Sequence, residues 1–256
     1  MSNTTHAKRM SPITLAVIAT MALGLCDPAA SADAGKENTT MASEPATLSR
    51  KQLGIAPIAA AMALGDMLKL DAALNLGLDA GLTVGDAKEI LVQLYAYTGF
   101  PRSLNALGQL MKVLDARKRR GIHDPAGREP APVPTGSELL ALGTANQTKL
   151  LGGPVKGPLF EFAPAIDDFL KRHLFGDIFA RDNLDWQSRE LATVSALAAM
   201  PGVESQLLSH IRISMNAGVT ASQLRQVADV LVKVGQADAA RRTQAAIETH
   251  LAGAAR

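Results

Sequence analysis

The sequence predicts an all-α protein, a helical bundle made of two similar halves. In the ranges 48–120 and 160–252, alanine, leucine and methionine recur at spacings of three and four residues. This is the period at which one face of an α-helix is buried, and neither range contains the alternating β-branched runs that indicate strands. The composition is 47% hydrophobic and 20% charged over 256 residues, so the chain can form a large core and is too apolar for disorder.

The first half, residues 48–118, is expected to form helices near 53–65, 67–79, 84–98 and 102–119. Gly81 and Gly99 stand where the chain would leave a helix, and Pro101 stands where the last helix would begin. Glycine adopts the left-handed conformation that ends many helices, and proline is tolerated in a first turn because its missing N–H is not needed there.

Residues 119–158 are interpreted as a linker, because they hold six of the 13 prolines. One short helix is expected inside this linker, from Ser137 to Leu151.

The second half, residues 159–256, is expected to be helical near 160–173, 175–181, 186–200, 203–217, 221–234 and 237–252. Asp185 and Thr220 each stand directly before one of these stretches. Their side-chain oxygens can accept hydrogen bonds from the first backbone N–H groups of a helix, so both are predicted to be N-caps.

The two halves match one another along the chain. Residues 78–83 align with residues 215–220 at an offset of 137 positions, which places Gly81 on Gly218. The helix that follows continues the match, with residues 87–91 aligned to 224–228. The sequence therefore predicts two copies of one helical unit.

Residues 1–32 have the order of features typical of an export signal. Lys8 and Arg9 precede an uncharged apolar run over residues 11–26, and small residues that a signal peptidase can recognise end at Ala32. The run is shorter than the roughly 20 residues needed to span a bilayer. Cleavage after Ala32 is therefore expected, with no stable membrane span left in the mature protein.

The mature protein is expected to be periplasmic or secreted, and to begin with a disordered polar leader over residues 33–47. A lipid anchor on Cys26 is the weaker alternative, because the bulky Leu25 directly precedes the cysteine where lipoprotein signals have a small residue.

Charge and cysteine content exclude several classes of function. The formal net charge of +2 is far from the concentrated positive field that nucleic-acid binding requires. Cys26 is the one cysteine, which excludes an intramolecular disulfide, a CxxC redox pair and a multi-cysteine metal site. His123, His173 and His250 have no ligand spacing around them, so no metal site is expected.

Three segments carry a family resemblance: residues 189–191 (Arg-Glu-Leu), residues 210–220, and residues 97–107 in the first half. They resemble the carboxymuconolactone decarboxylase family, which also contains the alkyl hydroperoxidase D-like proteins. The resemblance covers roughly residues 48–115 and 160–250. The resemblance implies an all-helical bundle with the alkyl hydroperoxidase D-like fold. It also implies assembly into trimers or hexamers, with active sites between neighbouring units. We expect a homotrimer.

The peroxidase branch of this family has a CxxC pair ahead of a histidine. Those cysteine positions fall on Val203 and Gln206 here, with the histidine on His210. A thiolate is the group that attacks a peroxide, and neither valine nor glutamine can become one. Thiol peroxidase activity is therefore excluded, even though a family-level antioxidant label would suggest it.

The decarboxylase branch keeps a glutamate and a histidine, which match Glu190 and His210. In the first half the corresponding positions fall near Leu53 and on Ala73, so that copy is expected to lack a site. The resemblance implies a lyase that acts without a cofactor on a small carboxylated lactone or a related cyclic acid.

In this reaction, loss of carbon dioxide leaves a carbanion, His210 delivers a proton to it, and Glu190 orients or recharges the histidine. Arg189 or Arg212 would neutralise a substrate carboxylate, and Trp186 would stack on the substrate. The 20-residue spacing of Glu190 and His210, with a turn at residues 200–202, lets two antiparallel helices bring them face to face.

Each of these five residues also has a purely structural interpretation. Glu190 can be a carboxylate paired with a neighbouring helix, and His210 can be a boundary residue bonded to backbone. Arg189 and Arg212 can be surface ion-pair partners, and Trp186 a packing or interface anchor. The alternative function is therefore a non-catalytic, exported, oligomeric binding module of the same fold, which the export signal and the missing first-half site favour.

Overall fold

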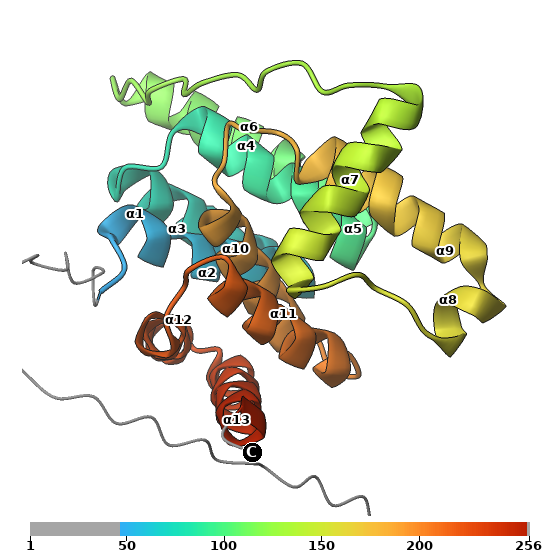
Figure 1. Ribbon diagram of the computed structural model, residues 1–256. Helices are drawn as coiled ribbons and strands as arrows, with labels where there is room; N and C mark the ends of the chain where they lie inside the picture. Colours follow the sequence, from blue (N-terminus) through green and yellow to red (C-terminus); the bar gives the residue numbers. More distant parts are fainter. Residues whose placement is uncertain (1–46, 255–256) are drawn as a thin grey trace, which may run out of the picture. The chain divides into compact units, whose positions relative to one another are not determined.

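The computed structural model of the protein describes residues 47–254. The expected export signal and nearly all of the expected leader lie outside the described residues. Within them every regular element is a helix, which confirms the predicted all-α fold (Figure 1). No helix among these residues is both long and apolar enough to cross a membrane.

The helices of the first half are α1 (Arg50–Leu53), α2 (Ile55–Leu64), α3 (Met67–Asp79), α4 (Val84–Gln93), α5 (Tyr95–Thr98) and α6 (Phe100–Arg119). The expected helix over 84–98 is interrupted at Leu94, so the short α5 stands apart from α4. Gly99 follows α5 with φ of 81°, a conformation that favours glycine, and Pro101 lies in the first turn of α6 as predicted.

The segment predicted to be a linker contains α7 (Gly136–Leu151), one residue longer than the expected helix. It does not run free of the rest of the protein, because α7 packs against a π-helical stretch, η1 (Leu170–Ile178) (Figure 1). Gly143 makes this contact possible, since a Cβ there would overlap the backbone carbonyl of Lys171.

The second half continues with α8 (Pro158–Phe162), α9 (Pro164–Phe169), η1, α10 (Trp186–Ala199), α11 (Glu204–Asn216), α12 (Ala221–Lys233) and α13 (Ala237–Ala254). The single helix expected over 160–173 is divided, because Pro164 starts a new helix and the π-helical stretch begins at Leu170. Asp185 accepts a hydrogen bond from the backbone N–H of Ser188 at 2.8 Å, and Thr220 forms a capping box with Gln223, so both predicted N-caps are confirmed.

The two halves have helices that start at corresponding positions. α3 and α11 have the same bounds after a shift of 137 residues, and α4 and α6 begin where α12 and α13 begin under the same shift. Thr83 and Thr220, which correspond, both form capping boxes. This agreement is what a tandem repeat of one helical unit requires.

The central contact of the bundle is between α2 and α10, the corresponding helices of the two halves. Both are rich in alanine, and nearly all their residues are buried. Small side chains allow two helix backbones to approach closely, and burying both helices removes much apolar area from water. As a result α10, which carries Glu190, is enclosed by both halves of the chain.

Candidate active site

Glu190 and His210 meet as their spacing predicts. α10 and α11 are neighbours in the chain that pack against each other, and the Glu190 Oε2 atom lies 2.8 Å from His210 Nδ1. Glu190 is fully buried, and the His210 side chain is 11% exposed. Val194 and Leu197 share the helical register of Glu190, but the whole of α10 from Ser188 to Ala199 is buried, so Glu190 would be buried on any side of this helix.

The hydrogen bond to Glu190 decides which histidine nitrogen is available for chemistry. A carboxylate is an acceptor, so it selects the tautomer in which His210 Nδ1 carries the proton and donates it. The opposite nitrogen, Nε2, is then the one left for a ligand in the cavity that the His210 ring lines.

The cavity beside His210 has a volume of about 410 Å³. Most of its wall is apolar and comes from α7 to η1, where the lining residues include Leu151, Leu159, Phe160, Ile166 and Phe175. Polar groups gather on the α11 side, where Gln206 and Ser209 stand near His210. The site therefore suits a small molecule with an apolar ring and a polar edge.

Tyr97, on α5 of the first half, is a site residue that the sequence did not single out for a role. Its ring contacts the His210 ring edge-on, with 5.3 Å between centroids, and it lines the cavity. The phenol oxygen and Glu190 Oε1 are both buried, and Glu190 Oε1 has no hydrogen-bond partner among the described residues. Burial, and next the charge of Glu190, raise the pKa of Tyr97, so its hydroxyl stays protonated.

Arg189 does not line the cavity. It is fully buried on the other side of α10, where its Nη2 atom lies 2.9 Å from Glu89 Oε1 and donates to the backbone carbonyl of Arg181. Burial alone would raise the pKa of Glu89, but hydrogen bonds from Arg181 and Arg189 and the charge of Arg189 hold it below its usual value. The charge of Arg189 is thus used inside the fold, as an ion pair between α4 and α10.

Arg212 and Trp186 also lie away from the cavity. Arg212 is exposed on α11, as expected for a residue two positions from His210. The Trp186 indole donates to the carbonyl of Phe179 at 2.9 Å, and Lys149 lies 5.1 Å above its ring. The described residues that line the cavity include neither lysine nor arginine, so the groups expected to neutralise a carboxylate are not brought to it.

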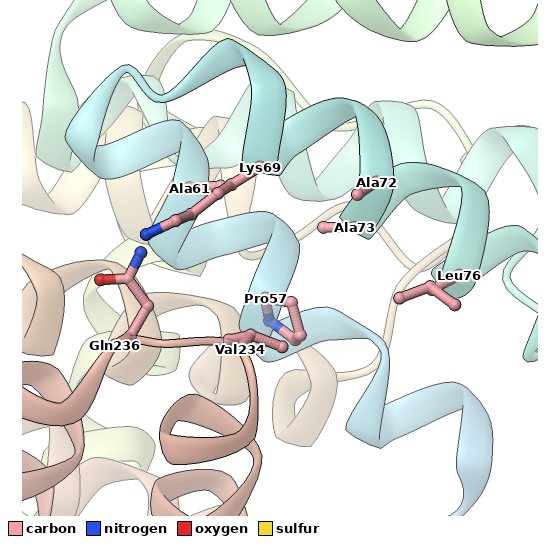
Figure 2. Close-up of a pocket in the computed structure, with 8 residues that line it drawn as sticks. All are labelled: Pro57, Ala61, Lys69, Ala72, Ala73, Leu76, Val234 and Gln236. Carbon is pink, nitrogen blue, oxygen red and sulfur yellow. The ribbon is translucent and has the colours of Figure 1, made fainter.

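The first half has a cavity in the corresponding place, with a volume of about 240 Å³ (Figure 2). Five of its eight lining positions match those of the His210 cavity at the 137-residue offset. Ala73 corresponds to His210 and Val234 to Tyr97, and Lys69, Ala72 and Leu76 correspond to Gln206, Ser209 and Ile213. Ala73 is the predicted counterpart of the histidine, so this cavity has the position of a site without its acid–base pair.

Fold and site together define an all-α protein with a buried glutamate–histidine pair on antiparallel helices, beside an apolar cavity. Residues 164–249, from α9 into α13, match the sequence model of the Carboxymuconolactone decarboxylase family. The predicted family resemblance is thereby confirmed for the part of the chain that contains Glu190 and His210.

A curated relative agrees with this family. The 4-carboxymuconolactone decarboxylase of Acinetobacter baylyi (strain ATCC 33305 / BD413 / ADP1) is 32% identical to this chain over 69 residues. The match covers 27% of this chain and 51% of the relative, so the chain spans about half the length of the curated relative it matches.

Proposed function

We propose that the protein is a decarboxylase-type enzyme in which Glu190 and His210 carry out proton transfer on a small cyclic acid. The observation that carries this proposal is the buried 2.8 Å contact between the two side chains at the wall of a cavity large enough for such a substrate. Side chains in this arrangement are suited to general acid–base catalysis, because the carboxylate fixes the imidazole and stabilises its charged form.

In the proposed reaction the substrate is a carboxylated lactone or a related cyclic acid. The bond between the ring carbon and the carboxylate breaks, carbon dioxide leaves, and the electron pair remains on the ring as an enolate-type carbanion. His210 in its protonated form donates the Nε2 proton to that carbon, and Glu190 stabilises the imidazolium before this step. The scheme uses no cofactor.

The cavity wall supports a particular orientation of this substrate. The ring would lie against the apolar residues of α7 to η1, and the carboxylate would lie near the polar groups of α11, Gln206 and Ser209. Arg189, which is paired with Glu89 inside the fold, takes no part in this reaction.

The proposal is tested by screening the purified protein against carboxylated lactones and following carbon dioxide release. We expect turnover without added metal or cofactor, and loss of turnover in the His210→Ala variant. If lactone acids bind and no carbon dioxide is released under any condition, the non-catalytic binding module is the better description.

A further inference from the structure

The cavity in the first half has chemical features that differ from those of the His210 cavity. It lies between α2, α3 and the α12–α13 connection, and most of its wall is apolar (Figure 2). Pro57 and Ala61 contribute from α2, Ala73 and Leu76 from α3, and Val234 from the connection. The two polar side chains of its lining, Lys69 and Gln236, both present nitrogen atoms.

These two nitrogens point toward each other across the mouth of the cavity. Figure 2 shows the ammonium of Lys69 and the amide nitrogen of Gln236 facing one another. The Gln236 Nε2 atom is buried and has no hydrogen-bond partner among the described residues. The buried amide nitrogen lacks an acceptor and the ammonium that faces it cannot supply one, so an anion placed between the two would accept hydrogen bonds from both.

Asp66, the acidic side chain beside Lys69, forms only a weak ion pair with it. Asp66 lies 3.8 Å from Lys69 Nζ, and both side chains are more than a third exposed. Such a surface ion pair contributes little to stability because water screens it, so Lys69 can also bind another anion.

We propose that this cavity binds a small monocarboxylate with an apolar body. The carboxylate accepts hydrogen bonds from Lys69 Nζ and Gln236 Nε2 at the mouth, and the body fills the space beside Ala73. An apolar cavity of about 150 Å³ is enough to hold benzene. The 240 Å³ available here therefore suits a ligand of the size of benzoate.

The ligand is bound in this cavity without being converted. Ala73 stands where the His210 cavity has its histidine, and the lining contains no carboxylate or imidazole to move a proton. The cavity beside His210 thus has the Glu190–His210 pair, and the cavity beside Ala73 has the cation, Lys69. Both features were expected together in one active site. Binding here is independent of the proposed decarboxylation and is measured without any turnover.

The test is isothermal titration calorimetry of the full chain with benzoate, and with neutral benzamide as the matched probe. We expect saturable binding of benzoate, weaker binding of benzamide, and weakening of the benzoate interaction as salt is added. Lys69→Met should weaken benzoate binding at least tenfold. Gln236→Glu should abolish it, because the new carboxylate occupies the position of the ligand. Lys118→Met, a change to an exposed lysine that does not line the cavity, should leave binding unchanged.

Ala73→Leu distinguishes this cavity from the one beside His210. The larger side chain fills the space in which the apolar body would lie, so benzoate binding should be lost while the thermal unfolding midpoint is retained. The proposal is overturned if benzoate fails to bind, if benzamide binds as tightly, or if the Lys69→Met variant binds benzoate as the parent does. It is equally overturned if the folded Ala73→Leu protein still binds it, since benzoate then lies elsewhere.

Discussion

Glu190 and His210 show what a sequence can reveal about a pair of residues. Their separation of 20 residues spans one helix, one turn and part of a second helix, and this local geometry is enough to bring the side chains together. Tyr97 and Arg189 could not be placed in this way. Tyr97 reaches the site from the other half of the chain, and Arg189 finds Glu89 at a separation of 100 residues. Only the tertiary fold determines these partners.

Replacing either member of the pair should reduce turnover strongly. We expect Glu190→Gln and His210→Ala each to lower kcat by about 10²-fold or more on a confirmed substrate, which is the usual contribution of a general acid or base. Steady-state kinetics measure this effect, and circular dichroism checks that the variants fold. Glu248→Gln and His250→Ala, at positions on α13 outside the cavity, are the matched controls. Full turnover in both site variants would show that the chemistry takes place elsewhere.

At the level of elements, the sequence predicted helices whose ends depend on local signals. α3 was expected at 67–79 and is found there, and α10 and α12 begin after the predicted caps Asp185 and Thr220. The packing of α7 against η1 was not predictable, because it depends on the absence of a side chain at Gly143 and on the position of the Lys171 carbonyl. The sequence therefore predicts this helix but not that it packs into the bundle and forms part of the cavity wall.

The ion pair between α4 and α10 should make a large, pH-dependent contribution to stability. Glu89→Gln leaves Arg189 buried without its charged partner, and we expect the free energy of unfolding to fall by about 3–5 kcal/mol at pH 7. Urea denaturation measures this loss. Glu248→Gln, which removes an exposed ion pair with Arg225, is the control and should change stability by no more than about 1 kcal/mol.

The sign of the pH dependence follows from the pKa of Glu89, which is lower in the folded protein than its usual value. The stabilisation is therefore complete above the ordinary glutamate pKa and is lost as the pH falls through the folded value. The difference between parent and Glu89→Gln should shrink as the solution is acidified below about pH 4. A difference that stays constant over this range would mean that the charge of Glu89 is not what stabilises the fold.

For the whole molecule, we predict a homotrimer. Large apolar side chains are exposed on α3 and α6, including Leu68 at 87%, Leu104 at 64% and Met111 at 68%. Covering such side chains with a second copy removes apolar area from water, which favours association. Size-exclusion chromatography with light scattering gives the mass directly, and a monomer at micromolar concentration would contradict the prediction.

Export is also a property of the whole chain. If residues 1–32 are a signal peptide, protein recovered from the native envelope fraction should begin at Asp33. Amino-terminal sequencing identifies the first residue. An intact Met1 on protein from the cytosol would show that the segment is retained.

The two halves, which meet at α2 and α10, belong to one polypeptide. They can therefore differ in sequence in a way that two identical subunits cannot. In a symmetric dimer of separate chains each substitution appears twice, so a histidine lost from one pocket is lost from both. Here both units belong to one polypeptide, and Ala73 and Lys69 occupy one pocket while His210 and Gln206 occupy the other. Joining the units therefore lets a single chain keep the histidine in one pocket while the residues of the other pocket change independently, and every chain carries one copy of each pocket.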